Sequence, residues 1–213
     1  MKKITILIIT VLFTLTTSAF AGGMIGVKYG KGDLEGNAKS YVAGSNTYAA
    51  QSGSKDSEFA AIFAEVNIKE SPFSVGLEYV PFDADISLNG KNSSLTSAKV
   101  DDYTTIYGLA MRELTNFSVY AKLGYSMADI GTIKNNDATT TAITAASDSL
   151  EGIMYGVGVQ SKELPFGLVA RAEYTMTEFD DISVTTTSNG SAAVKKTADG
   201  ELTTLTISLA KSF

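Results

Sequence analysis

Seven charged residues stand on the small, polar side of segments that alternate between apolar and small polar side chains. They are Lys28, Glu65, Glu78, Arg112, Lys122, Arg171 and Glu173. Inside a folded chain such groups can pair with one another, or they can line a path for ions. A charge taken out of water is costly unless it is paired. We therefore expect these side chains to form ion pairs, which either fill and stiffen an interior or line a narrow ion path.

Two residue types that often supply a catalytic acid, base or nucleophile are missing from this chain. The chain has 213 residues with no His and no Cys, and His is the commonest general acid or base. No GxSxG motif is present. The stretch GKGDLEG at residues 30–36 has loop glycines but lacks the GK[ST] ending and the following helix of a phosphate-binding loop. We predict no catalytic activity and no cofactor.

Three pairs of aspartates are the best candidates for binding a metal ion. They are Asp83 with Asp85, Asp101 with Asp102, and Asp180 with Asp181. Calcium prefers oxygen ligands, but the stretch DADISLNG does not follow the EF-hand pattern. Zinc and copper lack both His and Cys ligands here. Solvated acidic loops are the simpler explanation, and we predict no metal site.

Eight segments of about ten residues carry the alternation of apolar and polar residues, with the period of two that indicates β-strands. They cover residues 23–30, 58–68, 73–80, 103–112, 117–127, 152–160, 166–176 and 205–213. The second of them is apolar on both faces, so the register of residues 57–68, and with it the direction of Glu65, stays open.

The connections between these segments alternate strictly between short and long. Short turns are expected at residues 69–72, 113–116 and 161–165, and long polar loops at 31–56, 81–102, 128–150 and 177–201. All long loops therefore lie at one end of an up-and-down sheet. Such loops count against a compact soluble domain. They are typical of transmembrane barrels, which have long outer loops and short periplasmic turns.

The distribution of aromatic and small residues indicates which face of the sheet meets water. Four phenylalanines stand at the short-turn end of their strands and form a candidate aromatic girdle: Phe73, Phe117, Phe166 and Phe213. Five tyrosines follow further along the same faces: Tyr79, Tyr107, Tyr125, Tyr155 and Tyr174. Glycine is frequent on the opposite faces, as the narrow interior of an eight-stranded barrel requires. This favours an apolar outside and a polar inside, the reverse of a soluble sandwich.

The last nine residues, LTISLAKSF, end within an alternating strand and carry no polar tail. In hydrocarbon every unpaired backbone N–H or C=O group costs several kcal/mol, so a sheet in a membrane must close on itself. We therefore predict that the last strand pairs with the first. The fold class is an all-β, eight-stranded antiparallel up-and-down transmembrane barrel with four long outer loops and three short periplasmic turns.

On these features the chain resembles the small eight-stranded outer-membrane barrels of Gram-negative bacteria, the OmpA/OmpX-like group with its opacity- and porin-like surface proteins. In that group the last strand carries the signal read by the barrel-assembly machinery. The resemblance assigns this role to Leu205, Ile207, Leu209 and Phe213, while Lys211 departs from the pattern. It implies outer-membrane lipid and the assembly machinery as partners, and a monomer.

The N-terminus reads MKKITILIITVLFTLTTSAFA, with two lysines, an apolar run and a small-residue cleavage site. This is the pattern of a signal peptide. We expect residues 1–21 to be removed and residues 22–213 to form the barrel in the outer membrane. The net charge of −6, without basic clusters, argues against nucleic acid as a partner.

Two functions fit this chain. In the first, it is a non-catalytic barrel with a structural or surface-interaction role through its long extracellular loops. In the second, it is a narrow porin-like channel for ions or small solutes through a charge-lined lumen. Charges that pair across the lumen would indicate the first, and a continuous water-filled path would indicate the second.

Overall fold

A computed structural model gives the fold of residues 20–43, 45–81, 84–89, 95–130, 134–135, 140–145, 149–188 and 194–213. The predicted signal peptide lies outside these residues, except for its last two positions. None of the described residues form a helix long and apolar enough to cross a membrane.

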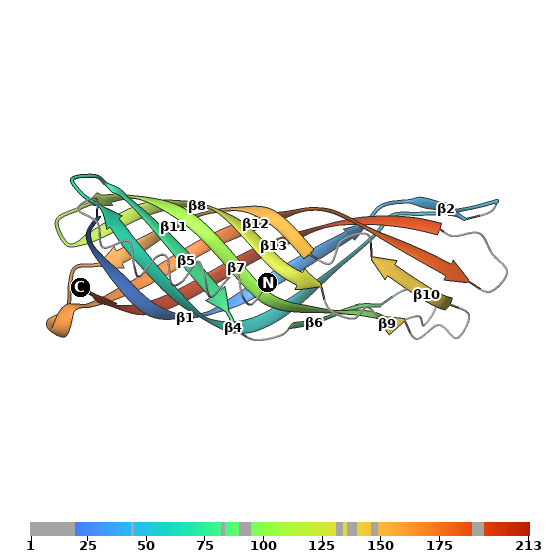
Figure 1. The fold of residues 1–213 in the computed structure, drawn as a ribbon, viewed down its shortest axis with the longest axis horizontal. Helices are drawn as coiled ribbons and strands as arrows, with labels where there is room; N and C mark the ends of the chain where they lie inside the picture. Colours follow the sequence, from blue (N-terminus) through green and yellow to red (C-terminus); the bar gives the residue numbers. More distant parts are fainter. Residues whose placement is uncertain are drawn as a thin grey trace.

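Eight long strands form one closed barrel, seen from the side in Figure 1. Their order around the barrel is β1-β4-β5-β7-β8-β11-β12-β13, and β13 pairs with both β12 and β1. Every pairing is antiparallel. The bounds are β1 Phe20–Ala38, β4 Gln51–Ile68, β5 Phe73–Val80, β7 Leu95–Glu113, β8 Phe117–Ile130, β11 Ser149–Ser161, β12 Leu168–Ser188 and β13 Val194–Ser212. The predicted eight-stranded antiparallel barrel is confirmed.

The barrel closes between its first and last strands, as the alternation up to the final residue predicts. β1 and β13 pair in continuous register from Met24 opposite Ser212 to Ala38 opposite Ala198. Beyond this ladder Gly23 and Phe213 exchange two backbone hydrogen bonds, each 3.0 Å long. The C-terminus lies at the end of the barrel that carries the short turns (Figure 1). The backbone of the last residue is therefore fixed on one side by the first strand.

Several strands extend much further than the segments of about ten residues that the sequence predicts, whereas β5 covers only the predicted residues 73–80. β1 continues to Ala38 and β13 begins at Val194, inside segments predicted as long loops. The β13 extension contains Val and Thr, which suit a paired strand. The β1 extension, KGDLEGNA, contains neither, and it is held as a strand by its pairing with β4 and β13 on both sides. Five further short strands lie in the same segments: β2 Tyr41–Ala43, β3 Asn46–Tyr48, β6 Ala84–Asn89, β9 Lys134–Asn135 and β10 Thr140–Ala145. Parts of all four predicted loops, at 31–56, 81–102, 128–150 and 177–201, lie outside the described residues.

The three connections at the opposite end are short, as predicted, although the third is longer than expected. β4 and β5 are joined by residues 69–72, and β7 and β8 by residues 114–116. Between β11 and β12 the chain forms a 3₁₀ turn, η1, at Pro165–Gly167. Phe166 lies in this turn with φ of 66°, so it does not begin the strand as the sequence suggested. Its side chain remains on the surface and is 87% exposed.

Alternate residues of each strand point into the barrel or away from it, and the two faces differ sharply. Val27, Leu123 and Ile207 on the outside are 60 to 65% exposed, whereas the neighbouring Lys28 and Lys122 are 4% exposed. A soluble protein would bury the apolar side chains and expose the lysines. Apolar groups outside and charges inside are the arrangement of a membrane barrel.

The face assignment predicted for β7 is wrong. Tyr107 and Leu109 point into the barrel and are 3% and 2% exposed, and Ile106 and Arg112 lie on the outside. The pairing of Leu109 with Lys122 fixes this orientation, because directly opposed residues of two strands share a face. β7 carries apolar residues on both faces, so choosing the bulkier set as the outer one reversed the strand.

Candidate functional site: the charged interior of the barrel

Two lysines and two glutamates from four strands meet near the middle of the interior. Lys28 of β1 contacts Glu78 of β5, with Nζ 2.6 Å from Oε2, and also contacts Glu173 of β12. Lys122 of β8 lies 3.0 Å from Glu78 and 3.5 Å from Glu173. Each cation therefore bridges the same two carboxylates. The four charges balance, and they connect strands on different sides of the barrel.

A second group lies beside the first. Arg171 of β12 makes a two-pronged contact with Glu65 of β4, at 2.9 and 3.0 Å. Its third nitrogen, Nε, donates to the Gln160 side chain at 2.6 Å. All of these side chains except Gln160 are nearly inaccessible to solvent. A buried guanidinium with this many partners is held in one orientation.

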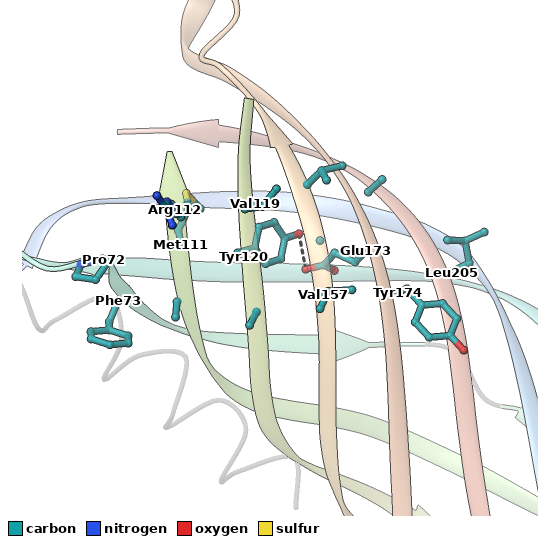
Figure 2. Close-up of a pocket in the computed structure, with 15 residues that line it drawn as sticks. Pro72, Phe73, Met111, Arg112, Val119, Tyr120, Val157, Glu173, Tyr174 and Leu205 are labelled. Carbon is teal, nitrogen blue, oxygen red and sulfur yellow. Dashed lines mark hydrogen bonds between the residues drawn. The ribbon is translucent and has the colours of Figure 1, made fainter. Parts of the chain in front are cut away.

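Two tyrosines connect the groups into one network. The Tyr107 hydroxyl donates to Glu65 at 3.2 Å, and the Tyr107 ring lies under Lys122, with Nζ 3.9 Å from its centre. The Tyr120 hydroxyl donates to Glu173 at 2.9 Å, a contact that Figure 2 shows as a dashed line. Ring faces attract cations electrostatically. The interior is thus filled by charges and aromatic rings that support each other.

Glycines opposite the tyrosines make room for these rings. Gly76 pairs with Tyr107 and Gly158 pairs with Tyr120 across neighbouring strands. A Cβ added at Gly76 would lie 2.4 Å from the Tyr107 ring, and one at Gly158 would lie 2.3 Å from the Tyr120 ring. No side chain other than hydrogen fits these two positions while the rings stay where they are. The small residues on the inner faces are therefore part of the site.

A layer of hydroxyl groups lies in the same interior, toward the extended end of the strands. Thr105 and Ser126 contact each other at 2.8 Å, and Thr175 and Thr204 do so at 2.7 Å. The Tyr103 hydroxyl joins this layer through Ser126, at 3.0 Å. These groups are uncharged and can donate or accept, so this part of the interior is polar without ion pairs.

Six of the seven charged residues predicted for the interior are brought together in this network, and Arg112 is not. It belongs to the reversed outer face of β7 and is exposed near the end of that strand. Three of the network's members were not predicted as site residues: Tyr107, Tyr120 and Gln160. A glycine directly opposite a tyrosine on the neighbouring strand is the signal that could have identified the tyrosines. This signal can be used only when the register between the two strands is known.

The other sequence-predicted residues lie on the surface. The side chains of Leu205, Ile207, Leu209 and Phe213 are 47 to 69% exposed on the outer face of β13 or at its end. Phe73, Phe117 and Phe166 are also exposed, at the end of the barrel with the short turns. No three His, Cys, Asp or Glu side chains converge among the described residues to hold a metal ion.

Outward-facing tyrosines mark the opposite edge of the apolar band. Tyr29 donates its hydroxyl to Glu58 at 2.7 Å, and Tyr155 donates to Glu178 at 2.7 Å. Tyr125 makes the same contact with Glu151, at 2.5 Å. Aromatic side chains with one polar end collect at membrane–water boundaries. The lipid-facing band therefore runs from the phenylalanines at the turns to these tyrosines. Of the five predicted outer tyrosines, Tyr107 alone lies inside the barrel.

No protein-family profile and no curated protein sequence matches this chain. Among solved structures, it is similar to Ail, the attachment invasion locus protein of Yersinia pestis, solved with the heparin analogue sucrose octasulfate. The identity is 13% over 91% of this chain and 100% of that one, with a TM-score of 0.44. Neisserial surface protein A is similar at 12% identity over 88% of this chain and 99% of that one, with a TM-score of 0.42.

The outer membrane protease OmpT of Escherichia coli is similar at 8% identity, over 93% of this chain and 99% of that one, with a TM-score of 0.44. At such identities the function has to be argued from the residues of this chain itself. Its closed ring of eight strands, apolar outer face and charged interior are the architecture of a Gram-negative outer-membrane β-barrel protein.

Proposed function

We propose that this protein is a non-catalytic barrel of the outer membrane whose lumen is closed by its own charged side chains. Its activity resides in the strand extensions on the extracellular side. The observation that carries this proposal is the bridging of Glu78 and Glu173 by both Lys28 and Lys122. Each ion that crossed this layer would have to break contacts between buried charges. The layer therefore supports a structural plug.

The extended strands support the surface-interaction part of the proposal. The β2–β3 hairpin at the tip of the first extension carries Tyr41 and Tyr48 stacked on each other, with ring centres 4.7 Å apart. Lys196 of β13 lies over the Tyr41 ring at 4.8 Å. Val42 and Tyr48 are exposed on this hairpin. A hairpin with exposed apolar and aromatic groups is a suitable contact surface for another macromolecule.

Shortening this hairpin tests the surface role. Ala38 and Gln51 are directly paired, so residues 39–50 can be replaced by an Asn-Gly turn that leaves the barrel ladder intact. We expect cells that carry this variant to display a folded barrel but to adhere less to epithelial cells, and to each other, than cells with the wild type. A Val27→Ala variant on the lipid face is the control. Equal adhesion of the wild type and the shortened variant would contradict the role of this extension.

A narrow channel is the second candidate, and two buried hydroxyl groups beside the charged network are the observation that favours it. The hydroxyl oxygens of Thr206 and Ser208 are buried on the inner face of β13 and have no hydrogen-bond partner among the described residues. Buried polar atoms of this kind are usually satisfied by water. The swelling of liposomes that contain the refolded barrel, placed in an arabinose solution, tests whether a solute passes through the lumen. We expect no swelling.

The route to the membrane is also a proposal. Residues 1–21 act as the cleaved export signal, and Leu205, Ile207, Leu209 and Phe213 present the last strand to the assembly machinery. We expect a monomer, and in support of this both edges of each of the eight barrel strands are paired within one chain, so no edge is left to join the sheet of another barrel. The mass of the mature protein tests cleavage after Ala21, and cross-linking in native membranes tests the monomer.

A further inference from the structure

A shallow groove of about 750 Å³ runs across the outer wall of the barrel (Figure 2). Its walls and floor come from consecutive strands, from β5 through β7, β8, β11 and β12 to β13. Met111, Tyr120, Gly158 and Glu173 in its lining belong to the interior face, and the other lining residues lie on the outer face. The outer part of the lining is almost entirely apolar, and its charged side chain is Arg112. The groove lies in the band that faces lipid.

Small residues form the floor of this groove. Ala110 of β7 is directly opposite Ala121 of β8, which is directly opposite Val157 of β11. The same row of paired residues begins at Phe73 on one side. On the other side it continues through Tyr174 to Leu205. Large side chains at both ends and small ones between them produce a trough instead of a ridge.

The distance that the row rises along the membrane normal fits one leaflet of a membrane. It crosses six neighbouring strands, and five spacings between strands measure about 24 Å. Because strands of such barrels are tilted by about 40°, a row at right angles to them rises by roughly 15 Å. That is about half the thickness of the hydrocarbon core. The row starts at Phe73, the first residue of β5 after its turn, so the groove spans the leaflet on the short-turn side.

Arg112 lies at the edge of the groove that is nearest to the short turns. It lies one residue before the end of β7, with its side chain on the lipid-facing side. The described part of the chain offers it no hydrogen bond or ion pair. The adjacent Glu113 is directed to Lys162, with 3.6 Å between Oε2 and Nζ. An unpaired guanidinium at this depth lies at the level of lipid phosphates, which it matches with two parallel N–H donors.

We propose that this groove binds one phospholipid of the short-turn-side leaflet, with an acyl chain over Ala110, Ala121 and Val157 and the phosphate on Arg112. An anionic headgroup is preferred, because the ammonium group of a zwitterionic lipid partly neutralises the attraction. The inference depends on the membrane placement of the barrel and is independent of both candidate functions of the protein.

The chain contains no Trp, so a single introduced tryptophan reports on its surroundings without background. Val159 lies in the groove, in the row of Val119 and Arg112. Ile62 lies on the lipid-facing side of β4, away from the groove. We would place one tryptophan at either position and refold each protein in phosphatidylcholine mixed with phosphatidylglycerol that carries brominated acyl chains. Bromine quenches tryptophan fluorescence on contact and so measures local lipid occupancy.

We expect the tryptophan of Val159→Trp to report a several-fold, up to roughly tenfold, higher affinity for the brominated anionic lipid than the tryptophan of Ile62→Trp. One charge-assisted contact between Arg112 and a phosphate is enough for a difference of this size. Arg112→Gln should remove this difference. Lys211→Ala, which removes another cation at the short-turn end of the barrel, should leave it unchanged. Ala121→Phe should lower the occupancy for both lipid classes by filling the floor. Equal quenching at both positions, or a preference that survives Arg112→Gln, would overturn the proposal.

Discussion

Glu65 and Arg171 are 106 positions apart in the sequence, and they form a two-pronged ion pair inside the barrel with N–O distances of 2.9 and 3.0 Å. Both side chains are at most 1% exposed. They come from β4 and β12, which are not neighbours in the barrel. The pair therefore acts as a strut across the interior.

Removing one partner of this strut should destabilise the barrel more than removing both. Arg171→Leu leaves the Glu65 carboxylate buried and unpaired, and we expect a loss of about 3–5 kcal/mol in the free energy of unfolding. Combining it with Glu65→Leu should restore most of this loss, because no buried charge then remains. Urea unfolding of the barrel refolded in liposomes measures both. If the double variant were as unstable as the single one, the pair would not be the cause.

The glycines opposite the interior tyrosines should be sensitive to a single methyl group. Gly158→Ala places a Cβ 2.3 Å from the Tyr120 ring, and we expect it to destabilise the barrel by about 1–3 kcal/mol through overpacking. Gly108→Ala is the matched control, since the nearest atom to its Cβ lies 4.0 Å away. Unfolding of the two variants side by side gives the comparison. Similar stability for both would contradict the packing described.

The closed barrel could be predicted from the sequence because alternation, turns and the C-terminal strand all follow from local patterns. The period of two in residues 117–127, for example, fixes Lys122 inside and Leu123 outside without any knowledge of the neighbours. β7 could not be predicted in the same way. Its two faces are similarly apolar, and its orientation depends on pairing with β8 and on the contact of Tyr107 with Glu65.

The strand extensions and the site's tyrosines were missed for related reasons. The polar composition of Thr-rich stretches such as residues 184–188 predicts a loop, although this stretch pairs with β13 on one side and with β10 on the other. The roles of Tyr107 and Tyr120 depend on which glycine lies across the sheet, and this is set by the register of strands that are distant in the sequence. Such information is tertiary and is not carried by any local window.

The orientation of β7 can be tested with spin labels, because the chain has no native Cys. We expect a label at Ile106→Cys to be accessible to oxygen dissolved in the lipid, and one at Tyr107→Cys to be shielded from it. Power-saturation EPR on the two refolded variants measures this accessibility. A label at Leu123→Cys serves as the lipid-facing reference. The opposite order at positions 106 and 107 would restore the orientation predicted from the sequence.

Phe213 should contribute in two separable ways. Phe213→Ala keeps the two backbone hydrogen bonds to Gly23 and loses the aromatic ring, whereas deletion of Phe213 loses both. We expect the substitution mainly to slow insertion by the assembly machinery, and the deletion also to lower the stability of the folded barrel. Insertion rates into proteoliposomes and heat-induced mobility shifts on gels measure the two effects. A substitution that leaves the insertion rate unchanged would argue against the assembly role of the ring.

The closed, charge-paired lumen is tested most directly by the conductance of the refolded barrel in a planar bilayer, recorded for the wild type, for Lys122→Ala and for Arg112→Ala. The structure predicts a silent wild type and a silent Arg112→Ala, because that substitution lies on the outer face. It predicts current in Lys122→Ala, which removes one of the two lysines that bridge Glu78 and Glu173. Discrete conductance steps in the wild type that change in Lys122→Ala would contradict the plug and make the protein a channel.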